Sequence, residues 1–123
     1  MGNRAVITTE EKRIGVYLHW NGGRDSVEAF LAVCKKLNHR PPETDCYGWA
    51  GLCQVIANYI GGTNSIGVDT IDRLDYNNGD NGVYIIKDWE IIGREFYDRP
   101  EQQEYQLDEM IVEIEASQPQ QTN

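Results

Sequence analysis

Long hydrophobic runs are missing from this sequence of 123 residues, whose apolar stretches, such as GVYL and YII, are only a few residues long. A helix that crosses a membrane needs about 20 consecutive apolar residues, so the sequence predicts no membrane partner. The first nine residues, MGNRAVITT, contain no hydrophobic signal core, and Val6 stands where a myristoylation motif requires Ser or Thr. We therefore expect a cytoplasmic protein.

Basic residues are also scarce. The chain has 11 Lys and Arg against 20 Asp and Glu, which gives a formal net charge of −9. This surplus argues against non-specific binding to DNA or RNA, because the phosphate backbone repels negative charge. An acidic surface has another use, which is to imitate nucleic acid and block a basic protein, and the composition leaves that alternative open.

Cysteine and histidine are too few for the usual metal or disulfide frameworks. An odd number of cysteines, three, indicates reduced thiols. Cys34, His39, Cys46 and Cys53 lack the close pairs that zinc sites use, so buried thiols are the better interpretation and no metal is expected. Neither histidine lies in a nucleophile motif, and G-x-S-x-G and H-E-x-x-H are absent. The sequence predicts no enzyme activity and no cofactor.

What the chain does contain is a regular series of strand and helix patterns. Its length suits one domain, which we expect over residues 1–116, with a flexible tail at 117–123. Alternating apolar residues and three-and-four spacings mark the elements. The predicted strands are 5–9, 13–20, 65–69, 70–74, 83–87 and 90–97, and the predicted helices are 26–38, 46–60 and 101–115.

The order of these elements predicts an α+β fold. The first two strands and the last two form hairpins, the second across residues 88–89, so the sheet is mostly antiparallel. Two central helices and a C-terminal helix cover one of its faces. Asp25 is expected to cap the first helix and Thr44 or Asp45 the second, which Gly61 ends.

The stretch HWNGGRDS, residues 19–26, joins a predicted strand to a predicted helix. Backbone N–H groups at a helix N-terminus favour anions, glycines admit a ligand to the backbone, and an arginine offers a planar fork for phosphate oxygens. The alternative is a structural turn, because Asp25 competes for the same donors. The candidate anion site consists of Trp20, Asn21, Gly22, Gly23 and Arg24.

On the last predicted strand, alternation puts Ile92, Arg94 and Phe96 on one face. An arginine beside an aromatic ring can hold a phosphate while the ring stacks on a base. Arg99 follows at the end of the strand, and the arginines form one site only if they converge with Arg24. The alternative is a core phenylalanine beside a solvent-facing arginine.

The segment DYNNGDNG, residues 75–82, is dense in turn residues. It is not an EF-hand loop, because the twelfth position from Asp75 is Ile86 and not Glu. A tight turn is expected, and its amide side chains can hydrogen-bond ribose hydroxyls or a base edge. These side chains are Asn77, Asn78 and Asn81.

The chain resembles the Thoeris anti-defence proteins of the first type, which are small sponge proteins of phages and prophages. The resemblance covers nearly the whole chain and is more specific than any single motif above. It rests on four segments in the same order, YLHWNGGRDSVEAFL, CYGWAGLCQVIANYIGG, NGDNGVYIIKDWEIIGREF and EQQEYQLDEM.

This resemblance implies a binding protein of the bacterial host cytoplasm. Members of the family bind cyclic ADP-ribose isomers made by TIR-domain defence proteins and keep them intact, so that the effector is never switched on. Some also capture cyclic di- and trinucleotides of CBASS signalling, and they form homo-oligomers from dimer to hexamer. Their pockets use aromatic stacking, arginines on phosphates and polar contacts to ribose. The alternative function is an acidic inhibitor that binds a bacterial defence enzyme directly.

Overall fold

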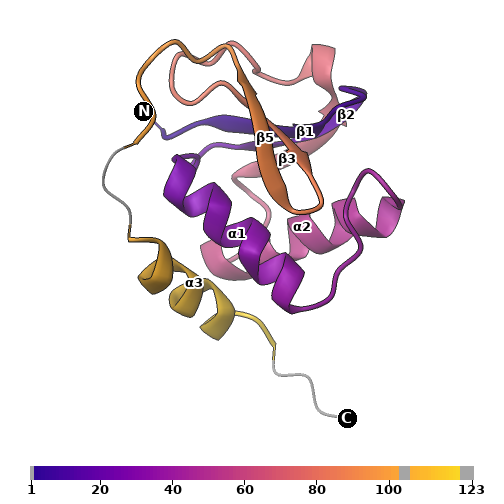
Figure 1. Ribbon diagram of the computed structural model, residues 1–123, viewed down its shortest axis with the longest axis vertical. Coiled ribbons are helices and arrows are strands. Elements are labelled where there is room, and N and C mark those ends of the chain that lie inside the picture. The colour runs from indigo at the N-terminus through magenta and orange to yellow at the C-terminus, as the bar shows by residue number, and fades with distance from the viewer. Residues whose placement is uncertain (1, 103–105, 120–123) are drawn as a thin grey trace.

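The structure is a computed structural model that describes residues 2–102 and 106–119, and Figure 1 shows the course of the chain. In order along the described chain, the elements are β1 (Ala5–Thr9), β2 (Ile14–Leu18), α1 (Arg24–Lys36), α2 (Cys46–Ile60), β3 (Ile66–Thr70), the 3-10 turn η1 (Ile71–Arg73), β4 (Val83–Lys87), β5 (Glu90–Glu95) and α3 (Leu107–Ala116).

The strands form one sheet in the order β3-β2-β1-β4-β5. β1 and β4 pair in parallel, and the other three pairs are antiparallel. A parallel pair needs a long crossover, and here the chain between β1 and β4 includes both central helices. β1 lies in the middle of the sheet with all five residues buried. The predicted α+β fold with a mostly antiparallel sheet is confirmed.

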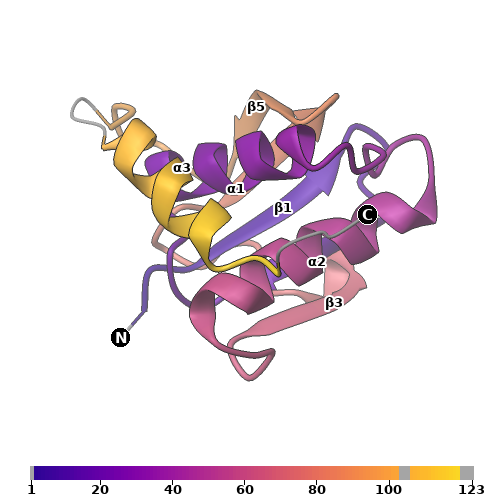
Figure 2. The same ribbon diagram turned by 90° about the horizontal axis from the view of Figure 1, so that it is seen from below.

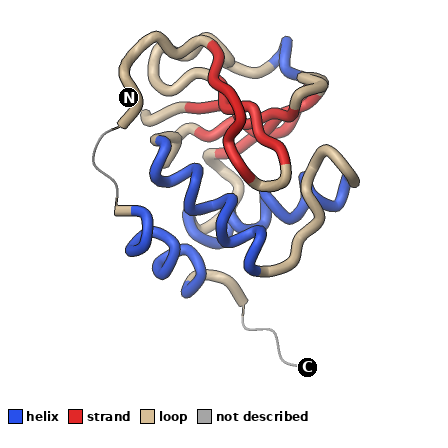
Figure 3. The backbone as a smooth tube through the Cα atoms, viewed as in Figure 1, coloured by secondary structure: helices blue, strands red, loops and turns tan. Residues whose placement is uncertain are grey.

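The helices α1, α2 and α3 gather on one side of the sheet, below the strands in Figure 3, and in Figure 2 β1 is visible between α1 and α2. Alternation along the central strands sends one set of apolar side chains toward these helices. The fully buried side chains of this core include Ile7, Leu18, Phe30, Leu52, Ile56 and Tyr84, and Ile114 adds to it from α3, which packs on α1 and α2. Within residues 2–102 and 106–119, none of the helices combines the length and apolar character needed to cross a membrane.

Both helix ends predicted for α2 are confirmed. The Asp45 carboxylate accepts a hydrogen bond from the Tyr47 N–H at 3.0 Å, and Gly61 ends the helix in the left-handed region with φ 90°. The predicted start of α1 is wrong. The helix begins at Arg24 after Gly23, and Asp25 lies in its first turn, where a carboxylate still favours the positive helix end.

The two short strands predicted at 65–69 and 70–74 are one strand, β3, followed by η1. The turn of η1 brings Ile71 against the face of the sheet that the helices leave uncovered. A methyl group built on Gly15 would lie 2.7 Å from Ile71 Cδ1. Ile71 is half-buried at this face in η1, and the following loop continues over the same face.

The C-terminal helix is shorter than predicted, because α3 begins at Leu107. Glu101 and Gln102 belong to the connection from β5, and residues 103–105 lie outside the described part of the chain. The helix ends at Ala116, directly before the predicted tail. Gln118 donates to the Val55 carbonyl at 3.0 Å and accepts from Asn58 at 2.8 Å, so residue 118 is held against α2. Residues 120–123 are outside the described part.

Candidate functional site

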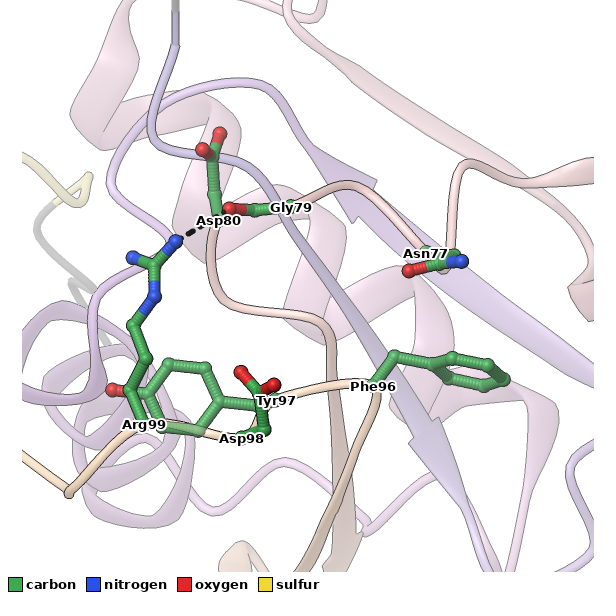
Figure 4. Close-up of a pocket in the computed structure, with 7 residues that line it drawn as sticks. All are labelled: Asn77, Gly79, Asp80, Phe96, Tyr97, Asp98 and Arg99. Carbon is green, nitrogen blue, oxygen red and sulfur yellow. Dashed lines mark hydrogen bonds between the residues drawn. The ribbon is translucent and has the colours of Figure 1, made fainter.

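A cavity of about 500 Å³ lies between the asparagine-rich loop and the segment that follows β5 (Figure 4). This volume is within the range of roughly 300–1,000 Å³ that small-molecule sites occupy. Two segments that are 14 or more residues apart in sequence meet here because β4 and β5 form a hairpin whose open end carries both. The lining residues are Asn77, Gly79, Asp80, Phe96, Tyr97, Asp98 and Arg99.

Phe96 provides the exposed aromatic ring of this cavity. Its backbone turns into the left-handed region, with φ 55°, so β5 stops at Glu95 and the ring leaves the sheet. The side chain is 51% exposed and meets the Tyr76 ring edge-on, with the centroids 4.9 Å apart. A large apolar ring held in a half-exposed position is a suitable stacking surface for a nucleobase.

Arg99 provides the cation at the other end of the cavity from Phe96 and Asn77, as Figure 4 shows. One of its N–H groups donates to the Gly79 carbonyl at 2.9 Å. This bond positions the guanidinium across the cavity, and the remaining donors of its five have the capacity to bind an anion.

Two carboxylates in the cavity, Asp80 and Asp98, supply hydrogen-bond acceptors. Asp80 accepts from Arg4 through Nε at 2.8 Å and through the backbone N–H at 3.1 Å, and this partner lowers the pKa of Asp80. Its negative charge is therefore balanced before any ligand arrives. Carboxylate acceptors of this kind suit the ribose hydroxyl groups of a nucleotide better than its phosphate groups.

The three asparagines of the loop have different positions. Asn77 is exposed and lines the cavity. Asn78 is buried, donates to the carbonyls of Asp75 and Gly82, and accepts from three backbone N–H groups. Asn81 donates to the Asn3 side chain and the Arg4 carbonyl. Asn78 and Asn81 thus hold the loop, and Asn77 is the one that lines the cavity.

The prediction that Ile92, Arg94 and Phe96 share a face is wrong. Ile85 pairs with Gly93 but Ile86 pairs with Ile91, so β5 contains a bulge at Ile92. A bulge reverses the alternation beyond it. Arg94 consequently lies opposite Tyr84 on the helix side of the sheet, and Phe96 has left the strand.

Arg94 is enclosed, with 10% of its side chain exposed. Its guanidinium lies between the rings of Tyr84 and Tyr97, 4.0 and 3.8 Å from their centroids. It donates to the Asn81 carbonyl at 2.7 Å and to Glu101 at 2.5 Å. Burial raises the pKa of Tyr84, whose hydroxyl donates to the Gly22 carbonyl at 2.7 Å.

The predicted anion cradle at residues 20–24 is occupied by groups of the chain itself. Gln102 Oε1 accepts from the Asp25 N–H at 3.3 Å, and the Asp25 carboxylate accepts from the Ser26 N–H at 2.8 Å. Arg24 contacts Glu101 at 2.7 Å and Glu28 at 3.5 Å. These donors are therefore engaged by intramolecular acceptors.

Gly22 of this turn serves packing. A Cβ on Gly22 would lie 2.4 Å from the Asn3 carbonyl oxygen, so the backbones approach too closely for a side chain. Asn21 adopts a left-handed conformation with φ 60°, and Trp20, 49% exposed, meets His19 edge-on. Residues 20–24 do not line the cavity described above.

The structure therefore brings five of the candidate residues together at two places. Asn77, Phe96 and Arg99 meet at the cavity, whereas Arg24 and Arg94 meet at Glu101. Sequence reasoning missed Tyr97, which both lines the cavity and stacks on Arg94, although its position beside Phe96 was a usable signal. It also missed Glu101, for which the sequence offers no signal.

The thiols and acidic side chains form no metal centre among the residues that the structure describes. Cys34 is buried in α1, and burial raises the pKa of its thiol, so it stays protonated. Cys46 is exposed at the start of α2, and Cys53 is half-buried.

No protein-family model, curated protein or solved structure matches this chain. The fold and the cavity define an α+β protein with one exposed ring, one cation and several hydrogen-bond acceptors around a small hollow.

Proposed function

We propose that this protein binds cyclic nucleotide immune signals and sequesters them without cleaving them. The single observation that supports the proposal is the meeting of Phe96, Arg99 and Asn77 at one cavity of about 500 Å³. The ligand class comes from the resemblance to the Thoeris anti-defence sponges, which implies cyclic ADP-ribose isomers and extends to cyclic di- and trinucleotides.

The cavity offers a partner for each part of such a ligand. The base stacks on the Phe96 ring, the phosphates meet the Arg99 guanidinium, and the ribose hydroxyls donate to Asp98 or hydrogen-bond with Asn77. Base stacking contributes about 1–3 kcal/mol, and charge-assisted hydrogen bonds about 1.5–3 kcal/mol each. A nanomolar complex, about 12 kcal/mol, thus requires most of these contacts together.

Sequestration requires affinity and abundance, and it requires no turnover. The net charge of −9 helps to exclude DNA and RNA from a site that accepts a compact anion. We propose that the protein acts in the cytoplasm of a bacterial host and as a homo-oligomer, in which a second chain closes the side of the cavity where Phe96 is exposed to solvent.

Titration calorimetry with the cyclic ADP-ribose isomers tests the proposal, with Phe96→Ala as the site variant and Ile92→Ala as the matched control. Ile92 is as exposed as Phe96, at 50%, but does not line the cavity. Loss of the stacked ring should weaken binding about tenfold or more, whereas Ile92→Ala should bind like the wild type.

Equal affinities for Phe96→Ala and the wild type would exclude the cavity as the site. A wild-type protein that binds none of the cyclic nucleotides but inhibits the purified defence enzyme would replace the proposal with the direct protein inhibitor.

A further inference from the structure

Arg24 and Arg94 converge on one carboxylate, that of Glu101. Arg24 Nη1 lies 2.7 Å from Oε2, and Arg94 Nη1 lies 2.5 Å from Oε1. We refer to these three residues as the arginine clamp. Arg24 also has Glu28 Oε1 at 3.5 Å, while the Glu28 Oε2 atom is buried without a partner among the described residues. Two guanidinium groups thus bind the two oxygens of one acidic group.

The Arg94 side of the clamp is rigidly built. Its guanidinium is nine-tenths buried between Tyr84 and Tyr97, and a bond to the Asn81 carbonyl fixes its plane. Holding a buried cation costs several kcal/mol unless an anion compensates it. The position where Glu101 lies must therefore contain negative charge.

The acidic side of the clamp is different. Glu101 lies outside the helices and strands, on the connection from β5 to α3, and 38% of its side chain is exposed. Its carboxylate can leave the clamp and regain water, whereas Arg94 cannot. A phosphate group has more acceptor oxygens and more charge than a carboxylate, so it is the stronger partner for two guanidinium groups.

We infer that the arginine clamp is a second anion subsite, specific for phosphate or diphosphate groups, which Glu101 closes in the absence of ligand. A phosphate group that enters binds Arg24 and Arg94 and displaces Glu101 into solvent. As a subsite for a nucleotide this inference rests on the proposed function, but binding of an inorganic anion does not.

The clamp and the cavity are connected by one short segment. Residues 96–99 line the cavity, and Glu101 follows Arg99 by two positions, a span of at most about 7 Å. Tyr97 belongs to both, because its ring lines the cavity and stacks on Arg94. Release of Glu101 therefore frees the segment that carries Phe96 and Arg99 to adjust to a ligand.

Calorimetric titration with inorganic pyrophosphate at low salt tests the inference. The variant Glu101→Gln removes the competing charge and should bind pyrophosphate about tenfold tighter than the wild type. Glu115→Gln is the matched control, since it makes the same change of net charge on α3, where Glu115 forms an ion pair with Lys36 of α1. It should bind like the wild type, and adding Arg24→Gln to Glu101→Gln should abolish the gain.

The inference is overturned if Glu101→Gln and the wild type bind pyrophosphate equally, if Glu115→Gln shows the same gain, or if the gain survives Arg24→Gln. A second measurement uses the wild-type chain and does not depend on how the variants fold. Saturating pyrophosphate should shift the NMR resonance of the Glu101 carboxyl carbon and leave that of Glu115 in place, and an unmoved Glu101 resonance would also overturn the inference.

Pyrophosphate contains no base, so Phe96→Ala should leave its binding unchanged. This separates the two proposals. If pyrophosphate does not bind the arginine clamp while cyclic ADP-ribose binding still depends on Phe96, only the inference about the clamp is overturned. If pyrophosphate binds the arginine clamp but no cyclic nucleotide binds the cavity, only the proposed function is overturned.

Discussion

Asn77 and Asn78 are neighbours of the same type with opposite environments, and together they show what a single residue contributes. Asn78 is 5% exposed, and its side-chain amide hydrogen-bonds to the backbone N–H and carbonyl of Gly82. Asn77, in contrast, is exposed at the cavity. The chemistry of the side chain is therefore used for folding at one position and is available for a ligand at the other.

Asn78→Ala should lower the free energy of unfolding by about 2 kcal/mol, because it leaves the buried N–H of Gly82 without its acceptor. Asn77→Ala, the same change one position earlier, should stay within about 0.5 kcal/mol of the wild type. Urea denaturation followed by circular dichroism measures both. Similar losses for the two variants would contradict the assignment of Asn78 as the structural residue.

At the scale of elements, the turn between β2 and α1 has the sequence of an anion site and the structure of a packed turn. Two consecutive glycines before an arginine predict a site that a ligand's phosphate can approach. In the structure the space at Gly22 is taken by the backbone of Asn3, and two N–H groups in the first turn of α1 donate to the side chains of Gln102 and Asp25. A glycine permits the close approach of a ligand or of another backbone segment, and the sequence of the turn does not tell these two cases apart.

The two glycines should therefore respond differently to substitution. Gly22→Ala puts a methyl group 2.4 Å from the Asn3 carbonyl oxygen and should destabilise the fold by about 1–3 kcal/mol. Gly23→Ala meets its nearest atom, Asp25 Oδ1, at 3.3 Å, and should cost less than about 1 kcal/mol. Thermal unfolding compares the pair, and a Gly22 variant as stable as the Gly23 variant would refute the packing role.

The sequence predicted the β4–β5 hairpin because its apolar runs flank residues 88–89, which adopt φ 51° and 62° in the turn. It could not predict the bulge at Ile92. Ile91 and Ile92 are identical residues, and the pairing with Ile86 decides which one faces the helices. This one shift moves Arg94 from the expected ligand face to the helix face, because side-chain alternation is reversed beyond the bulge.

At the scale of the whole molecule, the ion pairs that the sequence did not predict join residues that are far apart along the chain. Arg24 and Glu101 are 77 positions apart, and Arg4 and Asp80 are 76 apart. The fold class followed from local patterns of apolar residues, whereas these ion pairs depend on how the finished elements pack. The candidate cavity was predicted in part, through Asn77, Phe96 and Arg99, because all three lie near the ends of one hairpin.

The Arg4–Asp80 pair ties the N-terminal segment to the loop that forms the cavity, and it should make stability depend on pH. Arg4 lowers the pKa of Asp80 below the unfolded value of about 3.9. Its stabilising contribution is therefore present above that pH and is lost as the pH falls through the lower, folded pKa. Urea midpoints measured at pH 7 and pH 3 should differ less for Asp80→Asn than for the wild type.

The control is Asp72→Asn, which removes an exposed carboxylate of η1 and should keep the pH dependence of the wild type. If Asp80→Asn loses as much stability on acidification as the wild type does, the pair does not contribute to the acid sensitivity of the fold.

The central proposal is that the molecule holds a cyclic messenger and leaves it chemically whole. The most direct measurement mixes the protein with the cyclic ADP-ribose isomers, removes unbound nucleotide by gel filtration, denatures the protein by heat and identifies what is released by mass spectrometry. We predict release of the unaltered cyclic nucleotide in proportion to the protein. Recovery of no nucleotide, or of a hydrolysed product, would contradict the proposal.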